Sequence, residues 1–144
     1  MELTVEVLRA FVRDNSSLNR VFDGVEFQDS DYAAAIQWGD LEQESIPPFI
    51  NGFQASELPV AIRRLGALAC LFEMASIEAM RNNSNLSEAG VPIPVGENAS
   101  LYERLYSRYL GLYNDKVHNF KTARNMENAM MYQGSVYGRH LPGK

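Results

Sequence analysis

The sequence predicts a mainly α-helical protein, built as a small bundle of about four helices. Three observations support this fold class. Apolar residues recur at helical spacing in several segments, turn and capping residues separate those segments, and 144 residues suit one domain better than two. Hydrophobic residues make up 46% of the chain and charged residues 22%, as in an ordinary globular protein. We expect a helical domain over residues 1–130 and an extended docking tail over residues 131–144.

The first helix is predicted over residues 3–13. Its apolar residues share one side at a spacing of 3.6: Leu3, Val7, Leu8 and Phe11. The second helix begins at Asp29 or Ser30, because either side chain can cap the first free amides. It ends before Pro47-Pro48, since a proline disfavours helical geometry in the preceding residue. Its inner side is expected to contain Tyr32, Ala35, Ile36, Gly39 and Leu41.

The third helix is predicted from about Leu58 to Arg81, with Ser56 as its cap and Pro59 in its first turn. Its middle, LGALACLF, is apolar on every side, which predicts a central core helix. Leu68 and Leu71 should therefore be buried.

Residues 82–99 have no helical periodicity and begin with a run of asparagine and serine. The alternation of Val91, Ile93 and Val95 with two prolines predicts an extended arm or a short edge strand. Loops this long in a compact domain are usually functional or flexible.

The fourth helix is predicted from Ser100, which forms a capping box with Glu103, to about Asn128. Four tyrosines follow one another at helical spacing: Tyr102, Tyr106, Tyr109 and Tyr113. Such a stripe is more often the edge of a core than a ligand site. Four hydroxyl groups that need partners also suit a half-hydrated surface such as an interface.

The last residues, 131–144, contain isolated glycines and a proline and lack an amphipathic period. This composition predicts a segment that is disordered alone and becomes ordered on a partner. The anchors expected in it are Tyr132, Val136, Tyr137 and Leu141.

Charge is distributed unevenly along the chain. Residues 1–100 carry 15 acids and 6 bases, whereas residues 101–144 carry 3 acids and 7 bases. We expect Arg104 and Arg108 of one subunit to meet an acidic surface of the next, formed by Asp40, Glu42 and Glu44. A competing interpretation places the bases of the fourth helix against nucleic-acid phosphates: Arg104, Arg108, Lys116, Lys121 and Arg124.

No sequence motif indicates an enzyme, a cofactor site or a metal site. His118 and His140 lack neighbouring ligands at metal-binding spacing, and no phosphate-binding glycine loop is present. The single cysteine, Cys70, lies in an apolar run, which favours a buried and inert thiol in a reducing compartment. No apolar run is long enough to span a membrane. We therefore expect a non-enzymatic protein without cofactors.

Two stretches carry a resemblance to a known family. The first is RDNSSLNRVFDGVEFQDSDYAAAIQ, followed by a loop containing IPPF. The second combines RNNSN, GVPIPV, YERLYSRYLGLYNDKVHNFKTARNMENA and YQGSVYG. Together they are similar to small virion proteins of tailed bacteriophages, and the similarity covers most of the chain. It implies a head–tail adaptor in the neck, which forms a ring beneath the portal.

In such adaptors the portal receives the C-terminal segment. Transferred to this chain, that role falls to residues 131–144, with Arg139 and His140 as polar contacts. The expected partners are the portal protein, other copies of the chain and other neck or tail proteins. Double-stranded DNA would pass without specific binding. The alternatives are another tail or baseplate subunit, or a small cytoplasmic regulatory or binding protein.

Overall fold

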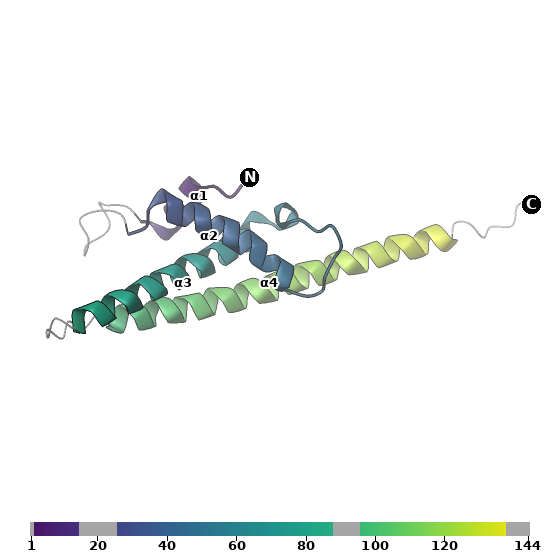
Figure 1. Ribbon diagram of the computed structural model, residues 1–144. Coiled ribbons are helices and arrows are strands. Elements are labelled where there is room, and N and C mark those ends of the chain that lie inside the picture. Colours follow the sequence, from purple (N-terminus) through teal and green to yellow (C-terminus); the bar gives the residue numbers. More distant parts are fainter. Residues whose placement is uncertain (1, 15–25, 88–95, 138–144) are drawn as a thin grey trace, which may run out of the picture.

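The computed structural model describes residues 2–14, 26–87 and 96–137 (Figure 1). These residues form four α-helices: α1 (Val5–Val12), α2 (Asp29–Glu42), α3 (Val60–Ser87) and α4 (Gly96–Tyr137). Two short 3₁₀ helices, η1 (Gln43–Ser45) and η2 (Ala55–Glu57), lie between α2 and α3. No strand occurs in the described ranges. The prediction of a mainly α-helical bundle is confirmed.

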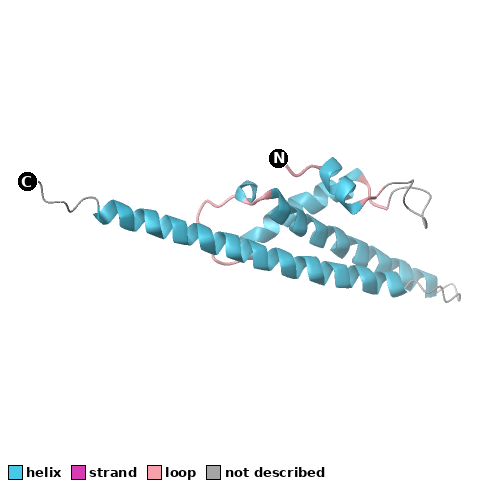
Figure 2. Ribbon diagram, turned by 180° about the vertical axis from the view of Figure 1, so that it is seen from behind, coloured by secondary structure: helices cyan, strands magenta, loops and turns pink. Residues whose placement is uncertain are grey.

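Helix α3 is the central element of the bundle. It runs antiparallel to α4 along one side and packs against α2 on the other (Figures 1 and 2). The side chains of Leu68 and Leu71 are 1% and 0% exposed to solvent. The prediction that both lie in the core is therefore confirmed. Small residues beside them, such as Ala67 and Ala75, are also buried and allow the neighbouring helices to approach.

A buried carboxylate joins the end of α1 to the start of α2. Asp14 follows α1 directly, and its two oxygens accept hydrogen bonds from the backbone amides of Glu26 and Phe27 at 2.7 and 2.8 Å. The Tyr32 hydroxyl donates to the same carboxylate at 3.0 Å. Burial and this carboxylate together raise the pKa of Tyr32. Asp14 therefore fixes the direction in which the chain enters α2.

Helices α2 and α3 touch through their backbones at Gly39. A Cβ atom placed on Gly39 would lie 2.6 Å from the backbone nitrogen of Ala67, which is closer than such atoms approach. Gly66 leaves similar room for the ring of Tyr113 on α4, and the Tyr113 hydroxyl donates to the Gly39 carbonyl at 2.7 Å. The missing side chains thus bring three helices together at one point.

A buried lysine on α4 holds the C-terminal end of α2. The Lys121 ammonium donates to the backbone carbonyls of Gln43 and Ile46, the second at 2.7 Å, and lies 5.4 Å from the centre of the Phe53 ring. The last carbonyls of a helix have no partners within it and carry partial negative charge, so a cation suits this position. Burial lowers the pKa of Lys121.

The predicted arm over residues 82–99 is shorter than expected. Helix α3 continues to Ser87 and α4 begins at Gly96, which leaves only residues 88–95 outside the described structure, including Val91, Ile93 and Val95. Asparagine and serine cost at most about 0.7 kcal/mol each in a helix, and residues 82–87 contain no glycine or proline. The asparagine-rich composition was therefore not sufficient to end α3.

The prediction of an extended tail beginning at residue 131 is wrong for its first half, because α4 remains helical through Tyr137. Gly134 costs only about 1 kcal/mol in a helix interior, and the preceding Ala129, Met130 and Met131 all favour helix. Residues 138–144 lie outside the described structure.

Two predicted caps and one inward side chain are also misplaced. Ser56 lies within η2 and does not cap α3, while Ser100 lies inside α4, one turn after its start. Leu41 faces outward on α2. The caps differ because α3 and α4 begin at other residues than the cap motifs indicated, and Leu41 lies about 120° around α2 from the buried Ala35.

Candidate interaction surfaces

The described side chains include exposed apolar groups and a small pocket with two carboxylates. No group of three or more His, Cys, Asp or Glu side chains in this part of the chain could hold a metal ion. Among the described helices, none combines the length and the apolar character needed to cross a membrane. The surfaces that stand out are an acidic pocket, exposed apolar side chains on α2 and the far end of α4.

Asp40, predicted to contact a neighbouring subunit, is instead paired within its own chain. Arg63 on α3 donates to its two carboxylate oxygens, from Nε at 2.9 Å and from the terminal nitrogen at 2.6 Å. The hydrogen bonds to Asp40 raise the pKa of Arg63. Asp40 therefore stabilises the packing of α2 against α3. It is no longer a candidate for a contact between subunits.

The other four predicted inter-subunit residues are exposed. Glu42 ends α2, and Glu44 lies in η1 just beyond it. Arg104 and Arg108 lie one turn apart on α4, where the Arg104 Nε donates to the backbone carbonyl of Ser100 at 3.2 Å. Arg108 makes no hydrogen bond or ion pair with any residue in the described ranges, so it is the freer of the two arginines.

The bases of α4 do not form a single surface for nucleic acid. Lys121 is buried against backbone carbonyls, and Arg124 pairs with Glu57 of η2 at 2.9 Å. Two of the five bases thus hold the bundle together. Phosphate binding by a continuous basic stripe along α4 is therefore not supported by their positions.

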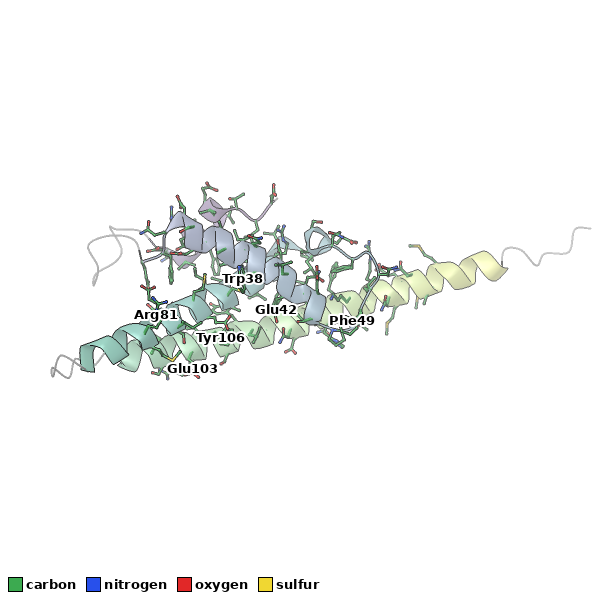
Figure 3. The ribbon with its side chains drawn as sticks, in the orientation of Figure 1. Trp38, Glu42, Phe49, Arg81, Glu103 and Tyr106 are labelled. Atoms are coloured by element: carbon green, nitrogen blue, oxygen red, sulfur yellow. The ribbon has the colours of Figure 1, made fainter. Side chains whose placement is uncertain are left out.

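An acidic pocket of about 250 Å³ lies between α2, α3 and α4. Figure 3 labels two of its lining residues, Glu42 and Tyr106. Two glutamates from different helices, Glu42 and Glu73, line it together with the thiol of Cys70 and the ring of Tyr106. The remaining lining residues are small or apolar: Gly66, Ala69, Leu110 and Tyr113. The one local signal for this pocket in the sequence is Glu73, the only charged residue within the apolar core stretch of α3 over residues 65–77.

Both carboxylates affect the groups inside the acidic pocket. Burial, with the charges of Glu73 and Glu42, raises the pKa of the Cys70 thiol from 9.0 to about 11. The same influences raise the pKa of Tyr106. A thiol with a raised pKa is a poor nucleophile, which agrees with an inert Cys70. The pocket is therefore suited to binding positive charge.

We expect Cys70 to contribute to a loss of stability at alkaline pH. The unfolded thiol releases its proton near pH 9, whereas the folded thiol keeps it up to about pH 11. Because the folded state then binds more protons than the unfolded state, stability falls as pH rises through this window. Urea unfolding at pH 8.5, 9.5 and 10 should show a shallower decline for Cys70→Ser than for the natural chain. An equal decline in both proteins would contradict this assignment.

A second, shallower depression of about 350 Å³ lies beside the acidic pocket, and Glu42 and Leu110 line both. Here the Nδ1 atom of His118 lies 2.9 Å from the carbonyl oxygen of Pro47 and can donate a hydrogen bond to it. This contact attaches the predicted Pro-Pro loop to α4. His118 is exposed on α4 and adds this one contact to the loop.

Exposed apolar side chains lie near the acidic pocket on α2. Trp38 is 67% exposed, and Leu41, three residues later on the same side of the helix, is also exposed. Phe49, in the loop after η1, is exposed as well. A large exposed tryptophan is uncommon on a monomer surface and is typical of the centre of a protein interface.

The far end of α4, residues 125–137, extends beyond the rest of the bundle and is called here the projecting end (Figure 1). Every side chain described in it is exposed, and Met130 and Met131 are 73% and 75% exposed. Met126 is exposed on the same side as Met130. Glu127 is the only charged residue among the thirteen.

The residues predicted to dock on the portal are distributed between helix and undescribed chain. Tyr132, Val136 and Tyr137 belong to the helical backbone of the projecting end. Arg139, His140 and Leu141 lie outside the described residues. The exposed apolar side chains described at or just before the predicted segment are the methionines of α4: Met126, Met130 and Met131.

Comparisons of the chain with protein-family models, with curated proteins and with solved structures gave no match. The similarity to tailed-phage virion proteins remains a prediction from the sequence.

Proposed function

We propose that this protein is a non-enzymatic structural subunit of a tailed-phage virion, a head–tail adaptor that forms a ring and joins capsid to tail. Its location would be the neck of the virion, after assembly in the host cytoplasm. The sequence resemblance suggests this station. The structural observation that carries a role in assembly is the projecting end of α4.

A helix surrounded by water on all sides is normally rich in charged residues, because exposed ion pairs and polar side chains stabilise it. The projecting end has one charge and three exposed methionines along about 20 Å of helix. An isolated helix of thirteen residues is only marginally stable in water. This surface is therefore suited to being covered by another protein chain.

Docking of an exposed helix into an apolar groove is a common mode of recognition, with anchors three, four or seven residues apart. Met126 and Met130 have this spacing, and flexible methionine side chains adapt well to an apolar surface. We therefore propose that this helical end docks on the portal protein, in place of the extended tail expected from the sequence.

The test replaces Met126 and Met130 with lysine and measures incorporation into particles. Particles produced without the protein are supplied with the natural or the variant chain, and attached tails are counted by electron microscopy. We expect the double variant to keep its helical circular dichroism and to lose most tail attachment, because two buried charges would oppose docking. Free heads and free tails would be the expected products.

Asn128→Lys provides the matched control, because residue 128 lies about 200° around the helix from residue 126. It adds the same charge at an exposed position on the other side of the projecting end. Normal tail attachment by the Met126 and Met130 variant would refute docking through this surface. Loss of a baseplate or of tail completion, with heads still joined to tails, would support the alternative of another tail subunit.

A further inference from the structure

We propose that the acidic pocket receives the Arg108 side chain of a second copy of this chain, in a head-to-tail contact. This inference rests on the proposed role in assembly and identifies the contact by which the subunits would associate. It refines the sequence-based pairing of Arg104 and Arg108 with the acids of α2: the receptor becomes Glu42 with Glu73, and Arg108 becomes the inserted group.

The acidic pocket is prepared for a cation that its own chain does not supply. Its two glutamates take part in none of the three ion pairs found within the described ranges. The ring of Tyr106 adds an aromatic face, on which a guanidinium group packs well. At about 250 Å³ the cavity is below the usual size of small-molecule sites, and its dimensions suit one long side chain.

The outer side of α4 carries the complementary group. Arg108 is exposed there, and Leu101 and Leu112 lie seven residues before it and four residues after it on the same side of the helix. Both leucines are exposed. An arginine between two apolar side chains matches the composition of interface centres, where arginine and large apolar groups are enriched.

A subunit cannot place Arg108 in its own pocket. Tyr106 and Leu110 line the pocket, and each is two residues away from Arg108 along α4. Residues two positions apart point about 200° away from each other on an α-helix. Arg108 therefore faces away from the cavity, and only another copy can bring an Arg108 into it.

The apolar side chains around the two surfaces also correspond. Trp38 lies four residues before Glu42 on α2 (Figure 3). Leu41 directly precedes Glu42 in the sequence. In the proposed contact, Leu101 and Leu112 of the incoming helix cover Trp38 and Leu41 of the receiving subunit. Because the two surfaces are different, the contact is heterologous. Each pair of subunits still has one unoccupied acidic pocket and one unbound Arg108. Such a contact produces a closed ring or an open filament.

The experiment uses two variants, each of which disables one side of the contact. Arg108→Gln keeps the pocket, and the double variant Glu42→Gln with Glu73→Gln keeps the arginine. All three positions are exposed, so folding should be preserved, as circular dichroism will verify. Sedimentation velocity at low salt, up to about 1 mM protein, measures association.

We expect the natural chain to form oligomers larger than a dimer, and each variant alone to associate at least about tenfold more weakly. A mixture of the two variants should form a one-to-one dimer and nothing larger, because only one intact pocket and one intact arginine meet. Lys116→Gln and Glu78→Gln remove equally exposed charges outside both surfaces and should oligomerise like the natural chain.

A natural chain that stays monomeric at about 1 mM would overturn the proposal, as would a mixture that contains no heterodimer. Variants that associate like the natural chain would also overturn it. None of these outcomes bears on docking by the projecting end, which the Met126 and Met130 variant tests separately. Failure of that variant's test would in turn leave the pocket contact standing.

Discussion

Leu71→Ala is expected to lower the free energy of unfolding by about 2–5 kcal/mol. The leucine side chain has no exposed surface and lies in the middle of α3, the helix that packs against both α2 and α4. Its removal leaves a cavity. The helices cannot move together to close it, because α2 and α3 already touch at Gly39 and the ring of Tyr113 already packs on Gly66. Urea denaturation followed by circular dichroism measures the change.

Leu68→Ala should show a loss of the same size, since Leu68 is equally enclosed. Ile77→Ala is the matched control, because Ile77 lies on the same helix with its side chain exposed. Its cost should stay within about 1 kcal/mol. A loss below about 1 kcal/mol for Leu71→Ala would show that α3 is not the central helix of the bundle.

Asp14→Ala should destabilise the protein by about 3 kcal/mol or more, because it leaves two backbone amides and a buried hydroxyl without their acceptor. Bonds to a charged group are stronger than neutral ones, and their loss is not compensated by water in a buried position. The consequence should be a looser junction between α1 and α2, which amide hydrogen exchange at Phe27 would report.

Tyr32→Phe distinguishes the parts of this network, since it removes one donor and leaves both backbone bonds to Asp14 in place. We expect a cost of about 1 kcal/mol. If Tyr32→Phe and Asp14→Ala were equally destabilising, the hydroxyl would be the main contact and the backbone bonds would matter little.

The helical bundle could be predicted from the sequence because its helices are defined by strong local signals. The apolar run of α3 and the acidic residues in the first turn of α2, Asp29 and Asp31, act within a few residues. Helix ends were less predictable. The asparagine-rich stretch after Arg81 and Gly134 in the projecting end each oppose helix by only about 1 kcal/mol or less, which neighbouring residues can outweigh.

The candidate surfaces depended on contacts between residues far apart in the sequence. Asp40 is one of seven acids over residues 23–44, and only the crossing of α2 over α3 brings Arg63 to it. Lys121 looked like an exposed base because its carbonyl partners precede it by more than seventy residues. The acidic pocket needed three helices to form, so no local pattern could indicate it.

The hydrogen bonds from α4 to the end of α2 and the loop after it affect how the exposed surface of that segment can evolve. Tyr113, Lys121 and His118 hold carbonyl oxygens of the main chain, which every amino acid possesses. The outward side chains of this segment, including Leu41 and Glu42, can therefore change without loosening that hold. Mutation could adapt the exposed surface to a different partner while the scaffold beneath it stays the same.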